Sequence, residues 1–178
     1  CETMVKGTDT GSTIILAGEI TCAPPKIDYE AVARKTAASI GYTDHAFGMD
    51  AETCEVELLI STQSPDISQG VDQGDINQGA GDQGLMFGFA TNESESYPTL
   101  SGHYMPLSAL LSQALTRRLT EVRENGLLPW SRPDGKSQVT IEYGAYGAPR
   151  RVWAVVIAIQ HDDMLEKFGS EKAELEFI

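Results

Sequence analysis

Three glycines and an aspartate form the most distinctive short motif of the chain. The run Gly79-Ala80-Gly81-Asp82-Gln83-Gly84 matches the pattern G-x-G-x-x-G. That pattern binds a dinucleotide only where it follows a strand and opens a helix, because the helix N-terminus then meets the pyrophosphate. Polar residues precede this motif and a strand-like segment follows it, so we predict no dinucleotide site. The glycines instead let the backbone approach a ligand, and Asp82 could bind an ammonium or metal ion; a tight turn with a solvated aspartate is the alternative.

A second group of candidate residues follows Trp130. In Arg132-Pro133-Asp134-Gly135-Lys136 we expect a turn, because proline presets φ and glycine supplies a positive φ. The turn would present Arg132, Asp134 and Lys136 at the mouth of a strand. Lys136 could there bind a phosphate, since this acidic chain has few cations. A plain surface turn is the alternative interpretation.

The histidines and cysteines do not form a metal or nucleophile motif. The three cysteines have no metal-ligand spacing, and each histidine stands alone in the sequence. We find no nucleophile elbow and no P-loop. An odd number of cysteines with no disulfide framework favours a reducing, cytoplasmic location.

The composition excludes several classes of partner. The 178 residues carry a formal net charge of −13 and are 41% hydrophobic, which suits one domain or two small ones with a real core. The negative charge argues against nucleic acid and against an anionic membrane surface. A small anionic ligand stays compatible, because a few placed cations can bind it. No apolar run approaches the length of a membrane span.

In the first part of the chain, the residue pattern predicts a strand, a helix and a second strand. Residues 12–21 are β-branched and predict a buried strand. Asp28 is expected to cap a helix over residues 29–40 that ends at Gly41. Residues 54–60 alternate and then become fully apolar, which predicts the second strand.

The remainder combines a long polar zone with further regular elements. Residues 63–84 are rich in glycine, aspartate and glutamine, which predicts a loop that is either functional or a flexible linker. Residues 85–90 predict a strand. The apolar spacing over residues 107–122 predicts an amphipathic helix. Residues 138–143 and 152–159 predict a β-hairpin whose second strand is apolar on both faces, as in a central strand. This order predicts an α+β fold, with mixed β-sheets and helices packed on one face.

Six stretches form a pattern larger than any single motif. They are Cys1-Glu2-Thr3, Gly18-Glu19-Ile20-Thr21, residues 63–72, residues 78–93, residues 132–140 and Gln160-His161. Together they resemble the S-adenosylmethionine synthase (methionine adenosyltransferase) family, in its order and at nearly its spacing. The resemblance runs across nearly the whole chain and covers somewhat under half of a full-length member.

The resemblance implies an enzyme that forms S-adenosylmethionine from ATP and L-methionine, releasing phosphate and diphosphate. The methionine sulfur would displace the triphosphate from the ribose C5′, with Mg²⁺ neutralising the phosphates and K⁺ assisting. Such chemistry depends on positioning and charge stabilisation, which suits a chain without a nucleophile-and-base pair. It further implies a homodimer or dimer of dimers, with the site between subunits and three α/β domains in each subunit.

Residue by residue, the resemblance assigns the methionine and potassium sites. Glu2 would be a ligand of K⁺, because a carboxylate oxygen is a hard anionic ligand for a hard cation. Glu19 and Gln63 would contact methionine. Asp82 would bind the ammonium group of methionine and is one of two expected catalytic residues.

The resemblance also assigns the nucleotide site and a gate. Asp134, Gly135 and Lys136 would line the ATP site, with Lys136 toward phosphate as the second expected catalytic residue. The segment from Gln63 to about Asp72 would be a mobile loop that gates the active site. We therefore divide the chain into a first α/β segment, a gating loop with its glycine-rich turn, and a second α/β segment with the long helix and the hairpin: residues 1–62, 63–84 and 85–178.

Parts of the family pattern do not occur in these residues. The family's catalytic histidine motif and its Mg²⁺-binding aspartates are absent, and neither end of the sequence carries a start or stop signal, so we expect a fragment that is inactive alone. Residues 94–104 also look longer than in the family. The alternative is a non-catalytic partner or regulatory module that keeps the fold.

Overall fold

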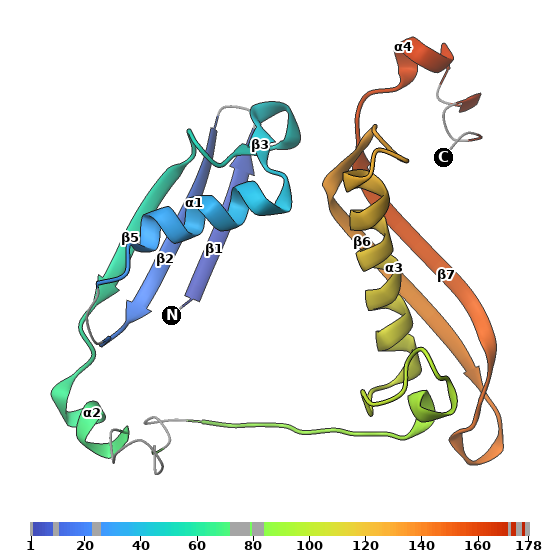
Figure 1. Cartoon of the computed structure of the whole chain (residues 1–178), viewed down its shortest axis with the longest axis horizontal. Coiled ribbons are helices and arrows are strands. Elements are labelled where there is room, and N and C mark those ends of the chain that lie inside the picture. The colour runs from blue at the N-terminus through green and yellow to red at the C-terminus, as the bar shows by residue number, and fades with distance from the viewer. Residues whose placement is uncertain are drawn as a thin grey trace. The chain divides into compact units, whose positions relative to one another are not determined.

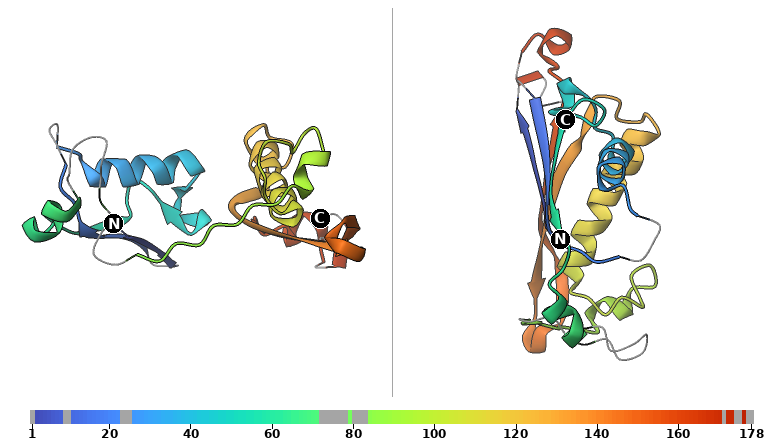
Figure 2. Two further views of the ribbon diagram at one scale, coloured as in Figure 1. Left: turned by 90° about the horizontal axis from the view of Figure 1, so that it is seen from below. Right: turned by 90° about the vertical axis from the view of Figure 1, so that its left-hand side faces the viewer.

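A computed structural model describes residues 2–8, 11–22, 26–71, 79, 84–170, 172–173 and 176. Contacts divide the chain into two compact units, Cys1–Phe87 and Gly88–Ile178. Figure 1 shows a sheet and a helix in each unit, and Figure 2 gives two further views. The α+β fold predicted from the sequence is confirmed. No helix in the described ranges is long and apolar enough to cross a membrane.

Unit 1 is built on a three-stranded sheet. Its elements are β1 (Glu2–Thr8), β2 (Gly11–Glu19), α1 (Tyr29–Ile40), β3 (Thr43–Asp44), a 3₁₀ turn (His45–Phe47), β4 (Met49–Asp50), β5 (Glu55–Ser61) and α2 (Pro65–Val71). The sheet order is β1-β2-β5, with β1 antiparallel and β5 parallel to β2. The parallel pair requires a crossover, and α1 supplies it.

The core of unit 1 lies between the sheet and α1. Ile14 and Leu16 of β2 point toward Ala37 of α1, and the loop before β5 adds Ala51 and Cys54 to the same cluster. Residues at alternate positions of a strand share a face, so the odd-numbered residues of β2 lie on the face away from α1. On this open face the residues of β2 are half-buried, and Met4 of β1 and Leu59 of β5 are exposed.

The bounds of α1 agree with the sequence prediction and have local causes. Asp28 is the N-cap, and its Oδ1 accepts from the Ala31 amide at 3.0 Å. Gly41 ends the helix with φ 111°, a conformation that glycine adopts without strain. Both signals are local in the sequence, which explains why the prediction succeeded.

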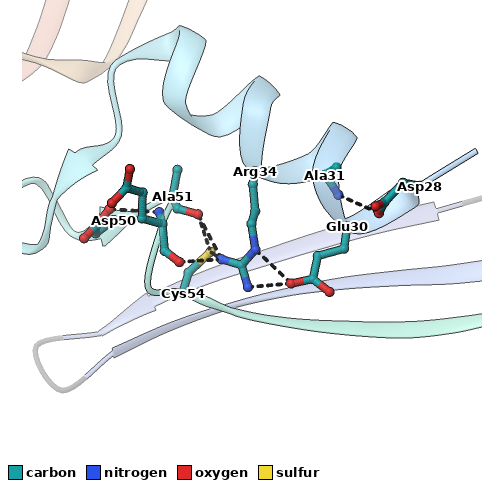
Figure 3. Close-up of polar contacts among 8 residues, drawn as sticks. Asp28, Glu30, Ala31, Arg34, Asp50, Ala51 and Cys54 are labelled. Atoms are coloured by element: carbon teal, nitrogen blue, oxygen red, sulfur yellow. Dashed lines mark hydrogen bonds and ion pairs between the residues drawn. The ribbon is translucent and has the colours of Figure 1, made fainter.

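Arg34 fastens α1 to the loop that leads into β5 (Figure 3). Its guanidinium donates to Oε1 of Glu30 at 2.8–2.9 Å and to the carbonyl oxygens of Ala51 and Glu52 at 2.9 and 3.0 Å. Its Nη1 also lies 3.6 Å from Sγ of Cys54. The hydrogen bond with Glu30 is the main cause that raises the pKa of Arg34, so the guanidinium that makes these contacts stays positively charged.

Unit 2 consists of a long helix on a two-stranded sheet. Its elements are a 3₁₀ turn (Glu93–Ser96), α3 (Leu107–Glu124), β6 (Ser131–Tyr143), a 3₁₀ turn (Ala145–Gly147), β7 (Pro149–His161) and α4 (Leu165–Phe168). β6 and β7 pair antiparallel, as predicted for the hairpin. α3 packs on β6, where Ser137 Oγ donates to the carbonyl of Ser112 at 2.7 Å.

The carboxylate of Glu95 binds two backbone amides across the loop that precedes α3. Glu95 accepts from the amides of Gly102 at 2.7 Å and Tyr104 at 3.0 Å. These two bonds lower the pKa of Glu95 from its ordinary value. Tyr143 Oη donates to Glu93 at 2.7 Å, which connects the loop with the end of β6 and raises the pKa of Tyr143. The segment noted as long in the sequence is therefore an ordered, closed loop.

Three expectations about elements were wrong. Residues 85–90 form no strand, because their backbone pairs with no other strand of the described structure. Their large apolar side chains are exposed, Phe87 to 90%. Part of the predicted loop is the helix α2, because Pro65 suits a first helical position and Asp66 the first turn. β7 pairs only with β6 in the described part of the chain, so its two apolar faces do not make it a central strand.

Candidate functional site

One edge of the unit 1 sheet brings together three of the residues assigned to methionine and potassium, namely Glu2, Glu19 and Gln63. Glu19 ends β2 and pairs in register with Ser61 at the end of β5, and the Ile20 amide donates to the Ser61 carbonyl at 2.8 Å. Gln63 follows two residues later. Glu2 begins the antiparallel β1 opposite Ala17. The carboxyl ends of β2 and β5 and the start of β1 thus coincide, and binding sites form preferentially at such an edge.

The edge is acidic and open to solvent. Glu2 and Glu19 are exposed and Gln63 is half-buried. Gly18, directly before Glu19, has φ 151°, which only glycine adopts readily. Two carboxylates and an amide favour an ammonium group or a monovalent cation, held by charge. No cluster of three or more histidine, cysteine, aspartate or glutamate side chains is placed to hold a metal ion among the described residues.

A hollow lies beside the N-terminus of α1, near the same edge. It has a volume of about 430 Å³ and is lined by Lys26, Ile27, Asp28, Tyr29, Leu58 and Ile60. Partial burial and a hydrogen bond with Cys22 raise the pKa of Tyr29 from 10.0. This combination of apolar walls with a few polar groups is typical of a small-molecule site.

The residues assigned to ATP lie in strand β6 and not in the expected turn. Ser131 pairs with His161 and Gly135 with Ile159, so three residues of β6 face only one residue of β7. This bulge accommodates Pro133, which has no amide to donate to a ladder. Gly135 does not have a positive φ, so the turn prediction was wrong.

Gly135 and Lys136 face opposite sides of the β6–β7 sheet. A Cβ atom at Gly135 would lie 3.6 Å from Ile159 Cγ2 and 3.8 Å from Leu119 Cδ1, so this position faces α3. Lys136 pairs with Ala158 and points to the side away from α3. Asp134 and Lys136 are exposed. Within the described part of the chain Lys136 forms no ion pair, which leaves its ammonium group available to a ligand.

Sequence reasoning missed Asp162, which lies one residue beyond β7. Its carboxylate holds Arg132 in the bulge, with Arg132 Nε donating to Oδ1 at 2.6 Å and Nη2 donating to Oδ2. The ring of Trp130 meets the ring of His161 edge-on at 6.2 Å beside them. Arg132 and Asp162 are thirty residues apart in the sequence, and only the register of the hairpin brings them together.

The central part of the glycine motif, including Asp82, lies outside the described residues. Of its glycines, Gly79 donates its amide to the Val71 carbonyl at 2.8 Å. A Cβ atom at Gly79 would lie 2.2 Å from the carbonyl oxygen of Gly70. The first glycine is therefore needed for close contact with the end of α2, a reason different from the ligand approach that we expected.

Comparison with known proteins adds an independent line of evidence. Residues 1–65 match a family model described as S-adenosylmethionine synthetase, N-terminal domain, and residues 77–176 match the model of its central domain. The S-adenosylmethionine synthase of Roseiflexus castenholzii is 48% identical over 174 residues, covering 90% of this chain and 40% of that protein. The S-adenosylmethionine synthase of Brachyspira hyodysenteriae is 46% identical over 170 residues, with the same coverage.

The chain spans about 40% of the length of these curated relatives. The two family models together cover both units, and the resemblance inferred from the sequence is confirmed. The chain therefore belongs to the S-adenosylmethionine synthetase family, of which it carries N-terminal and central domain sequence.

Proposed function

We propose that the protein containing this chain is a methionine adenosyltransferase, which forms S-adenosylmethionine, phosphate and diphosphate from ATP and L-methionine. The observation that carries the proposal is the convergence of Glu2, Glu19 and Gln63 at one sheet edge, in a chain of this family. These residues are distant in sequence and share no local motif. Their common location is what a methionine site with K⁺ close by requires.

At this edge, charge and hydrogen bonding would orient methionine. Glu19 and Gln63 would contact the amino acid, and Asp82 would bind its ammonium group. Glu2 would hold K⁺, which supplies positive charge near the substrates. Fixed contacts of this kind lower the barrier by aligning the sulfur for attack on the ribose C5′ of ATP.

On unit 2, Lys136 would bind the phosphates of ATP, and Asp134 and Gly135 would line the nucleotide site. The bond from C5′ to oxygen breaks as the sulfur–carbon bond forms, and the oxygen leaves with the triphosphate. Lys136 would stabilise the negative charge that grows on this leaving group. The described residues offer no cluster of histidine, cysteine or carboxylate side chains that could hold Mg²⁺.

We further propose that the protein forms a homodimer or a dimer of dimers. The open face of the unit 1 sheet carries apolar side chains, with Met4 59% and Leu59 56% exposed. Ile15 and Ala17 lie on the same face by register. The register also places Glu2, Lys6, Glu55 and Glu57 on this face. Exposed apolar side chains among charged ones suit an isologous contact with a second copy. Cys22 and Cys54 are free thiols, which is consistent with our proposal of a cytoplasmic location.

The first test is catalysis by the complete polypeptide that carries this chain. We expect ATP- and methionine-dependent synthesis of S-adenosylmethionine, and none from the 178 residues alone. Lys136→Ala should raise the KM for ATP, whereas the matched control Lys35→Ala, at an exposed position of α1, should not. A complete polypeptide that folds and self-associates but makes no product would overturn the proposal and favour the non-catalytic module.

The second test concerns the methionine edge. Glu19→Gln removes one carboxylate with little change of shape, so the KM for methionine should rise while the KM for ATP changes little. Glu52→Gln, at an exposed position in the loop before β5, is the matched control. Equal effects of the two substitutions would contradict the assignment of Glu19.

A further inference from the structure

The bulge in β6 is fastened by side chains as well as by the strand ladder. Arg132 lies in the bulge, and its guanidinium engages both carboxylate oxygens of Asp162. Its Nη1 also donates to the carbonyls of Pro129 at 3.3 Å and Ser131 at 3.2 Å. One side chain thus connects the bulge to the residue that follows β7 and to the segment that enters β6.

Asp162, the other member of this pair, is itself held by a backbone hydrogen bond. The Asp162 amide donates to the Trp130 carbonyl at 3.0 Å, directly after β7 ends. The Arg132 side chain is only 20% exposed and that of Asp162 is 42% exposed, so solvent screens the pair incompletely. A forked Arg–carboxylate contact fixes orientation as well as distance, because two parallel hydrogen bonds define a plane.

The hydrogen bonds between β6 and β7 do not fix the backbone conformation of β6 at the bulge. Residues 132–134 face a single residue of β7, so the regular pairing that fixes a strand is interrupted. Asp134 lies within this interruption and Lys136 one residue beyond the point where pairing resumes. The direction of the Asp134 side chain therefore depends on the conformation of the bulge, and Lys136, whose side of the sheet is set by its pairing with Ala158, lies next to this irregular segment.

We propose that Arg132 and Asp162 form a positioning pair, which holds the bulge so that Asp134 and Lys136 are aimed at the nucleotide. The inference rests on the proposed function, in which these residues bind ATP. Neither member of the pair need touch a substrate. The pair acts through the backbone, by removing alternative conformations of the bulge before ATP binds.

The test is the kinetics of Asp162→Asn in the complete polypeptide. The substitution keeps the shape of the side chain but replaces one acceptor of the fork with an NH₂ group, which cannot accept from Arg132. We expect the KM for ATP to rise about tenfold, the scale of one charge-assisted contact. The KM for methionine should change by less than about twofold, since the pair would act only on contacts with the nucleotide, whereas kcat should fall, because Lys136 would also stabilise the leaving triphosphate.

The neighbouring residue provides a matched control. Asp163 caps the turn at Leu165, with its Oδ1 accepting from the amide at 2.9 Å. Asp163→Asn should leave the KM for ATP unchanged. The double exchange Arg132→Asp with Asp162→Arg should recover part of the lost affinity, because it restores an opposite-charge pair across the same strands.

The outcomes separate this inference from the proposed function. If Lys136→Ala raises the KM for ATP but Asp162→Asn does not, the positioning pair is refuted and the proposed function stands. If Asp162→Asn raises both Michaelis constants equally and lowers the unfolding midpoint, its role is structural and the inference is also refuted. If Lys136→Ala leaves ATP binding unchanged, the nucleotide assignment itself fails. In a Lys136→Ala background, a positioning role predicts a smaller further effect of Asp162→Asn on the KM for ATP, because only Asp134 is then left to be positioned.

Discussion

Two adjacent isoleucines on β2 allow a direct test of which sheet face is the core. Ile14 is 3% exposed and belongs to the cluster with Ala37 and Cys54. Ile15, the next residue, lies on the open face and is half-buried. We predict that Ile14→Ala destabilises unit 1 much more than the chemically identical change Ile15→Ala.

The size of the effect follows from the number of buried atoms removed. Replacing Ile14 with alanine deletes three carbon groups at about 0.8 kcal/mol each, or about 2.4 kcal/mol of transfer free energy. The cavity left beside α1 raises the expected loss of unfolding free energy to about 3–4 kcal/mol. Ile15 is already partly in water, so the same deletion should cost about 1 kcal/mol.

The assay is urea denaturation followed by far-UV circular dichroism at several protein concentrations. Both tryptophans lie in unit 2, so tryptophan fluorescence would not report unit 1. The loss caused by Ile14→Ala should be independent of concentration. Any larger effect of Ile15→Ala should appear only where self-association contributes, because Ile15 lies on the proposed dimer face. Equal losses for the two variants at low concentration would refute the assignment of faces.

Three further predictions follow from single contacts. Gly7→Ala should destabilise unit 1 by about 2 kcal/mol in the same denaturation assay, because a Cβ atom there would lie 2.4 Å from the carbonyl oxygen of Gly48; an unchanged midpoint would contradict it. Arg34→Met should lower the midpoint of thermal unfolding more than Arg118→Met. Arg34 donates to two backbone carbonyls, whereas Arg118 forms an exposed ion pair within one helix. Equal shifts would show that Arg34 does not stabilise the contact between α1 and the loop before β5. The lowered pKa of Glu95 means that its contribution to loop stability is complete above its ordinary pKa of 4.5 and is lost as pH falls through the lowered value. The protection of the two amides that it binds, measured as the observed exchange rate relative to the intrinsic rate at the same pH, should therefore fall in acid, and Glu95→Gln should abolish this dependence.

Elements with local signals were the ones that the sequence predicted well. The helix beginning after Asp28 has its cap, its apolar positions and its terminal glycine within one short segment. The long helix α3 has its periodic apolar residues, of which Leu107, Leu110 and Val122 are buried. Such signals depend on neighbouring residues, so no tertiary information is needed to read them.

The errors occurred where pairing between distant segments decides the conformation. Pro133-Asp134-Gly135 has the composition of a turn, but the opposite strand β7 holds it as a bulge. The segment from Leu85 to Ala90 has the composition of a strand, but no described partner pairs with it. Composition states what a backbone can adopt, and the partner strand selects among these conformations.

The sequence by itself determined the family and the candidate residues, because long motifs retain their order and spacing regardless of conformation. It placed Glu2, Glu19 and Gln63 in one site only by resemblance. The tertiary structure decided that these three share a sheet edge, since register is a property of paired strands and not of one segment. It likewise decided that Arg132 meets Asp162, because a contact across thirty residues exists only once the hairpin has closed.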